Sequence, residues 1–232
     1  MPTLKNSQTF EVKPIGILHS CFKEKFATPR QPGLVTAAWA QVELHPPYNQ
    51  ADAVAGLEEF SHIWLSFVFH QTAQQGWKPK VRPPRLGGNQ KLGVFATRST
   101  FRPNPLGLSL VKLESIDTHK GVMLHVSGAD LIDATPVLDI KPYLPWVESI
   151  ADAKSGFASA DQVLQLPIYY SVQAQLALSG KPELLRLIEQ VLVHDPRPAY
   201  QQDIERIYGC NIADINLRWQ VRLDRIEVVE IN

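Results

Sequence analysis

The sequence predicts a mainly β fold for about its first two thirds, followed by a small α+β domain. Many short apolar and aromatic runs, punctuated by Pro and Gly, are typical of a closed or sandwich β architecture. Long helices do not alternate with these runs, and the pattern changes after residue 150. We therefore predict a β domain over residues 1–150 and an α+β domain over residues 151–232. With 232 residues, 44% of them hydrophobic, the chain can bury a main core and a smaller one.

Six segments of the first part are predicted strands: 10–18, 34–44, 60–70, 91–98, 107–116 and 121–131. Pro14 favours an edge position for the first of them. The third, FSHIWLSFVFH, is nearly all apolar, which predicts a strand buried on both faces. The turn DTHKG joins the last two strands as a hairpin. No Gly-x-Gly-x-x-Gly motif follows a strand, so the main signal of a doubly wound nucleotide fold is missing.

The second part combines helical and strand patterns. Residues 149–160 have the composition of a linker, and residues 159–180 have helical spacing that Pro167 interrupts. Residues 181–198 predict a helix that begins at Pro182, carries one leucine-rich stripe and ends at DPRP. Residues 216–231 alternate as a pair of strands.

Bulk composition narrows the class of protein. Two distant cysteines, Cys21 and Cys210, predict reduced thiols rather than a disulfide framework or a cysteine-based zinc site. Charges or prolines interrupt every apolar run before it reaches the length of a membrane span, and the first residues have no apolar signal core. The sequence predicts a cytoplasmic protein without a membrane partner.

Charge is unevenly distributed along a chain whose net charge is zero. Residues between Glu59 and Glu114 include eight Lys or Arg and no Asp or Glu. Such a segment predicts a local site for an anion, and phosphate is the commonest large anionic group. The alternative is a solvated basic loop that acids from the second half of the chain neutralise.

Four loops concentrate reactive side chains, but they do not match the common catalytic signatures. Asp130 and Asp133 lack a suitably spaced His, so no metal site is expected. No Gly-x-Ser-x-Gly elbow is present, and Cys21 has no base nearby in sequence. Acids and arginines without a metal signature indicate a polar ligand with its own reactivity, as S-adenosylmethionine (SAM) has. Asp130 or Asp133 would bind the ribose hydroxyls or the amino group of SAM, and Arg30 or Arg98 would bind its carboxylate. The same argument would also fit another nucleotide.

Four long motifs carry a resemblance to a known family. They are PIGILHSCFKEKFATPRQPG, GLEEFSHIWLSFVFHQ, GVFATRSTFRPNPLGLSLVKL and GADLIDATPVLDIKPYLP, and DPRPAYQ near the C-terminus agrees with them. Together they resemble the TsaA-like / TrmO (YaeB) family. The resemblance implies a β-barrel methyltransferase that uses SAM to methylate N6 of N6-threonylcarbamoyladenosine beside the anticodon of threonine tRNAs. It also implies a homodimer with the cofactor near the subunit interface.

The resemblance also implies the residues of the site. The cofactor would be held by Pro29, Arg30, Gln31, His70, Gln71, Arg98, Leu108, Asp130, Leu131, Ile132 and Asp133. Two positions depart from the family pattern: Thr100 stands where Pro is expected, and Ala134 where Gly is expected. The second departure matters only if residue 134 adopts a positive φ.

Two further sets of residues are predicted from their chemistry. The acceptor nitrogen loses a proton on methylation, and the nearest titratable candidates in the motifs are Asp139, Lys141 and Tyr143. Contacts with tRNA are predicted for Trp77, Lys78, Lys80, Arg82, Arg85, Arg102 and Arg197, with Trp77 as a stacking surface for an unpaired base. Two other functions stay open: a non-catalytic module that binds SAM or RNA, and a methyltransferase with a small-molecule acceptor.

Overall fold

A computed structural model describes residues 9–86, 90–158, 163–197 and 203–232 of the chain. Its first part is a closed six-stranded barrel with the strand order β1-β2-β7-β6-β3-β8. The barrel strands are β1 (Gly16–Ser20), β2 (Trp39–Leu44), β3 (His62–Val68), β6 (Leu106–Asp117), β7 (Met123–Ser127) and β8 (Thr135–Pro142). All neighbouring pairs are antiparallel. The mainly β fold and the barrel are thus confirmed.

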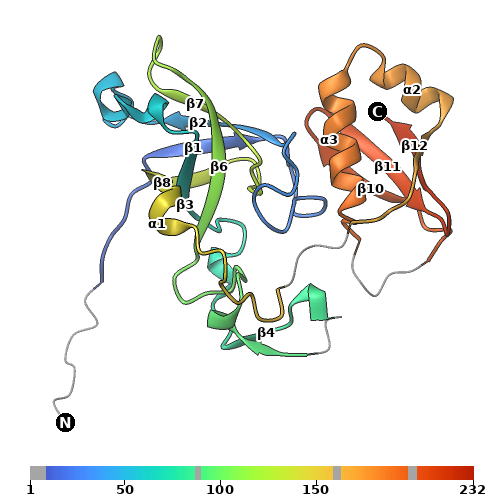
Figure 1. The fold of residues 1–232 in the computed structure, drawn as a ribbon, viewed down its shortest axis with the longest axis horizontal. Helices are drawn as coiled ribbons and strands as arrows, with labels where there is room; N and C mark the ends of the chain where they lie inside the picture. Colours follow the sequence, from blue (N-terminus) through green and yellow to red (C-terminus); the bar gives the residue numbers. More distant parts are fainter. Residues whose placement is uncertain (1–8, 87–89, 159–162, 198–202) are drawn as a thin grey trace.

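The second part is a four-stranded sheet covered by two helices (Figure 1). Its strands are β9 (Ile168–Tyr170), β10 (Tyr208–Ile212), β11 (Ile215–Val221) and β12 (Ile226–Ile231), and its helices are α2 (Val172–Leu178) and α3 (Pro182–Val193). Pro182 occupies the first turn of α3, as predicted. A short helix α1 (Pro145–Glu148) and a small hairpin of β4 (Lys80–Val81) with β5 (Leu92–Gly93) complete the elements.

Several strand predictions need correction. β1 begins only after Pro14 and pairs on both sides, because a closed barrel has no edge. β3 is not buried on both faces: Ile63, Leu65 and Phe67 point into the barrel, and the alternate residues are partly exposed. Segment 91–98 forms a two-residue strand followed by a 3-10 turn over Val94–Ala96.

The segment that connects β1 to β2 belongs to the core of the second part. Cys21, Phe22, Val35 and Ala38 are buried against residues of α3 and the four-stranded sheet. Backbone contacts support this packing, because the amide of Ala213 donates to the carbonyl of Cys21 at 2.6 Å. Residues 21–38 therefore tie the barrel to the second sheet. The division of the chain at residue 150 stays a prediction.

The sequence predicts no disulfide, no metal site and no membrane span, and the described residues bear on each of these expectations. Both cysteines are buried free thiols, and burial raises the pKa of each to about 12. Within the described ranges, no three His, Cys, Asp or Glu side chains gather to hold a metal ion. None of the described helices is long and apolar enough to cross a membrane.

Candidate active site

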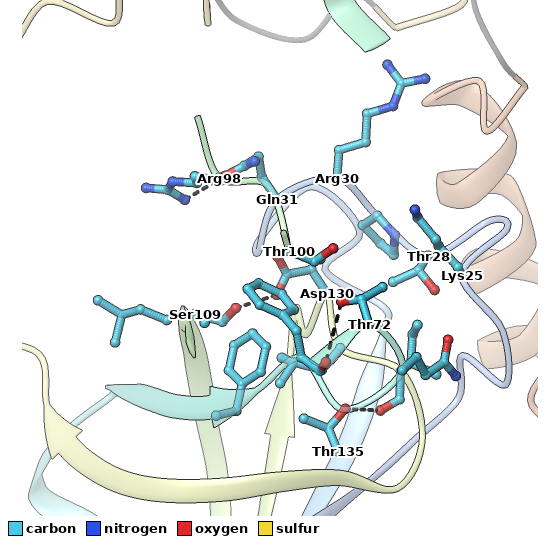
Figure 2. A pocket seen from close by; sticks show the side chains of 18 of the residues that line it. Lys25, Thr28, Arg30, Gln31, Thr72, Arg98, Thr100, Ser109, Asp130 and Thr135 are labelled. Carbon is cyan, nitrogen blue, oxygen red and sulfur yellow. Dashed lines mark hydrogen bonds between the residues drawn. The ribbon is translucent and has the colours of Figure 1, made fainter. Parts of the chain in front are cut away.

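A pocket of about 1160 Å³ lies where the barrel meets the second part. Its walls come from the β1–β2 segment, the outward face of β3, the start of β6, the turn before β8 and the end of α3. Figure 2 shows that the Ser109 hydroxyl is directed at the carboxylate of Asp130, whereas the hydroxyls of Thr72 and Thr135 donate to the carbonyls of Phe69 and Ile132. Segments that lie far apart in the sequence therefore contribute to one cavity.

Among the described residues that line this pocket, Asp130 is the one acidic residue. The hydroxyl of Ser109, which is 1% exposed on β6, donates to Oδ1 of Asp130 at 2.5 Å. Burial raises the pKa of Asp130 to about 6, against the opposing effects of the Ser109 hydrogen bond and the charge of Arg98. Because its charged form is poorly solvated, this carboxylate is suited to accept hydrogen bonds from a ligand.

The floor of the pocket depends on a glycine. Phe67 projects from β3 across Gly107 of β6, its partner in the strand register. A Cβ at residue 107 would lie 2.2 Å from the Phe67 ring. Phe69 meets that ring edge to face, with centroids 5.1 Å apart. The two aromatic rings give the pocket an apolar floor beside its polar groups.

Arg98 and Arg30 stand at different places on the rim. Nη1 of Arg98 donates to Oε1 of Gln31 at 2.5 Å, and Nη2 of Arg30 lies 3.4 Å from the carbonyls of Asp195 and Arg197. Figure 2 shows the two guanidinium groups pointing away from each other. They therefore do not form one clamp for a single carboxylate.

The pocket brings together most of the predicted cofactor set. Its lining includes Pro29, Arg30, Gln31, His70, Gln71, Arg98, Leu108, Asp130, Leu131 and Ile132. Asp133 is not among the lining residues. Its carboxylate accepts hydrogen bonds from the amide of Ser20 at 2.8 Å and from Lys23 at 3.0 Å. Asp133 thus joins the end of β1 to the turn that carries Asp130.

The three predicted catalytic residues lie outside the pocket lining, because β8 carries them away from the turn at Asp130. Asp139 and Lys141 form an ion pair on β8, and Asp139 borders a separate cavity of about 580 Å³. Tyr143 follows β8 and donates its amide to the carbonyl of His62 at the start of β3. A rise of about 3.3 Å per residue in a strand separates these residues from the turn despite their proximity in sequence.

The predicted RNA-binding residues are divided between the pocket and its surroundings. Arg82, Arg102 and Arg197 line the pocket, whereas Trp77, Lys78 and Lys80 do not. Lys78 lies over the ring of Phe101 at 4.0 Å. Nη1 of Arg102 donates to the carbonyls of Val94 and Thr97, and Arg197 pairs with Asp195. The side chain of Arg85 lies outside the described part of the structure.

Sequence reasoning missed several lining residues, among them Lys25, Phe67, Phe69, Thr72 and Ser109. The apolar outward residues of β3 were one available signal. Trp64 and Val68 face out of the barrel and line the pocket, so a ligand site explains why both faces of this strand are apolar.

Ala134, which stands where the family pattern has Gly, does adopt a positive φ. Its φ is +61°, a left-handed conformation that costs an L-residue about 1–2 kcal/mol. We expect Ala134→Gly to raise the free energy of unfolding by about 0.5–1 kcal/mol, because relief of strain exceeds the added flexibility of glycine in the unfolded chain. Urea denaturation measures the change.

The matched control is Ala55→Gly, at an exposed alanine with φ of −59°. It is expected to lower the free energy of unfolding by a similar amount. A loss of stability in both variants would contradict the strain at residue 134.

The fold and the site define a β-barrel protein with a large pocket between the barrel and the second part of the chain. The model for the tRNA-methyltransferase O N-terminal domain matches residues 17–149, and that for the TrmO C-terminal domain matches residues 162–232. The chain belongs to the TrmO family, which confirms the resemblance found in the motifs.

Individual relatives agree with this assignment. The tRNA (adenine(37)-N6)-methyltransferase of Escherichia coli K12 is 51% identical over 220 residues, covering 92% of this chain and 94% of the relative. A mouse protein with the same name is 49% identical over 134 residues, covering 57% of this chain and 30% of its own length. The crystal structure of TrmO from Pseudomonas aeruginosa superposes with a TM-score of 0.79 at 40% identity, covering 97% of this chain and 100% of that one.

Proposed function

We propose that this protein transfers a methyl group from SAM to N6 of N6-threonylcarbamoyladenosine beside the anticodon of threonine tRNAs. The observation that carries the proposal is the pocket around Asp130, which gathers ten of the eleven predicted cofactor residues. Relatives named for tRNA (adenine(37)-N6) methylation and for SAM-dependent methyl transfer or SAM binding support it. A cytoplasmic homodimer is part of the proposal, as the resemblance implies.

The pocket residues fit such a ligand pair. Asp130 would accept hydrogen bonds from the ribose hydroxyls or the amino group of SAM, and Arg98 would bind its carboxylate. Phe67, Phe69 and Leu131 would exclude water from the reacting groups. A pocket of about 1160 Å³ exceeds the roughly 300–1,000 Å³ usual for one small ligand, so it has room for donor and acceptor groups together.

SAM supplies an already activated methyl group, so the protein mainly has to align donor and acceptor. Positioning of two reactants contributes a large share of the rate in such transfers. The C-terminal end of α3 completes the wall opposite the barrel. Residues of both parts of the chain therefore take part in this alignment.

Transfer of labelled methyl groups from SAM to tRNA tests the proposal. We expect label on threonine tRNA from cells that make the threonylcarbamoyl group, and none on the same tRNA from cells that lack it. Nuclease digestion and mass spectrometry would locate the label on the modified adenosine. Absence of label from both tRNAs, with SAM binding intact in calorimetry, would contradict the proposal and favour a binding module or a small-molecule acceptor.

A further inference from the structure

Lys25 stands on a rigid turn at the wall of the pocket. Its neighbours Phe26 and Ala27 pack in the second core, where Phe26 stacks on Trp219 with ring centroids 5.7 Å apart. The amide of Thr28 donates to the carbonyl of Lys25, and the Thr28 hydroxyl donates to the carbonyl of Glu24 at 2.6 Å. The backbone at Lys25 is therefore fixed in place before any ligand arrives.

The cations of the pocket differ in their partners. Six described lining residues are Lys or Arg, against the single acid Asp130. Arg102 donates to backbone carbonyls, Arg197 pairs with Asp195, and Arg98 donates to Gln31. The ammonium group of Lys25 makes no hydrogen bond or ion pair with any other described residue, although its side chain lines the cavity. It is available to an anionic group of a ligand.

Lys25 and Arg98 lie on different walls. Lys25 belongs to the side next to the end of α3, and Arg98 to the rim above β6, as Figure 2 shows. The two ligands of the proposed reaction each carry a carboxylate: one on the methionine part of SAM and one on the threonyl group of the acceptor. Lys25 and Arg98, two separated cations among the six that line the cavity, match the two separated carboxylates of the ligands.

We propose that Lys25 binds the threonyl carboxylate of the acceptor nucleoside, so that this residue makes the enzyme select a modified adenosine. The inference rests on the proposed function and assigns substrate specificity within the same site. An adenosine without the carboxylate would leave the ammonium group of Lys25 unpaired in the occupied pocket. A site built for a polar group discriminates strongly against a ligand that lacks it.

The test compares two synthetic anticodon stem-loops. One carries N6-threonylcarbamoyladenosine, and the other carries the threoninol analogue, in which a hydroxymethyl group replaces the carboxylate. We expect wild-type kcat/KM to be roughly 10- to 100-fold lower on the analogue, the range for loss of a charged hydrogen bond. In Lys25→Met this ratio should fall close to one, and in Lys25→Arg it should be largely kept.

Controls separate this inference from the proposed function. Lys154→Met removes an exposed lysine outside the pocket and should keep the wild-type ratio. Failure of the wild type to methylate either stem-loop would contradict the proposed function itself. The inference alone is overturned if the wild type uses both stem-loops equally, if Lys25→Met keeps the wild-type ratio, or if that variant loses SAM binding in calorimetry.

Discussion

Asp130→Asn is expected to weaken SAM binding by at least about 100-fold while making the ligand-free protein more stable at neutral pH. The loss of binding follows because a neutral amide would accept weaker hydrogen bonds from the ligand than the ionised carboxylate does. The gain in stability follows because burial raises the pKa of Asp130 from its ordinary 3.8 to about 6. The ionised carboxylate is therefore a cost to the folded state, and asparagine removes it.

The difference in the free energy of unfolding between Asp130→Asn and the wild type increases with pH. At low pH the carboxyl is protonated in both folded and unfolded chains, so the variant gains nothing. The gain in unfolding free energy of Asp130→Asn over the wild type increases as pH rises from about 4 to about 6, and then stays constant at about 2–3 kcal/mol. Denaturation of both proteins at a series of pH values, with calorimetric titration of SAM, measures the two effects.

Asp133→Asn is the matched control. Burial raises the pKa of Asp133, but the Ser20 amide and Lys23 outweigh burial and hold the pKa below its usual value. The ionised Asp133 therefore stabilises the fold above its unfolded pKa, and this contribution is lost as pH falls through the folded pKa. Asp133→Asn should lower stability at neutral pH. A stability difference for Asp130→Asn that does not change with pH would refute the buried carboxylate.

Gly107→Ala is expected to destabilise the barrel by about 2–4 kcal/mol and to disturb ligand binding together with stability. The new methyl group would lie 2.2 Å from the ring of Phe67, which is itself enclosed in the barrel. Overpacking of a filled core costs about 1–3 kcal/mol and sometimes more. The displaced ring forms the pocket floor, so SAM affinity should fall as well. Urea denaturation and calorimetry record the two changes.

Gly93→Ala supplies the comparison for this effect. An added Cβ at residue 93 meets nothing within 4 Å, so this variant should remain within about 0.5 kcal/mol of the wild type and bind SAM normally. If Gly107→Ala behaved like Gly93→Ala, the position of Phe67 over β6 would be wrong.

The barrel could be anticipated from the sequence because its strands carry strong local signals. β3 and β6 combine β-branched and aromatic residues in runs of the right length. β8 was missed because Pro136 and Pro142 give its sequence the composition of a loop. β10 was missed because its five residues include Gly209 and Asn211. Neighbouring strands in the barrel and the sheet supply the pairing that these weak segments need.

The site was predictable as a set of motifs but not as an arrangement. The resemblance pointed to the cofactor residues, most of which line one pocket. It could not reveal that Asp133 bonds to Ser20, or that Asp139 faces another cavity. Lys25 was overlooked because nothing in its local sequence distinguishes it from solvated lysines nearby. Its position depends on packing between residues 21–38 and a sheet that is nearly 200 positions away in the chain.

That packing sets the order in which the molecule can mature during synthesis. Residues 21–38 are synthesised well before the strands that cover Phe22 and Val35. A nascent barrel would expose these apolar side chains until residues 208–231 emerge. Transiently exposed apolar surface of this kind is what chaperones bind. The wall that bears Lys25 would form only after those residues emerge, so the pocket is completed later in synthesis than the barrel strands.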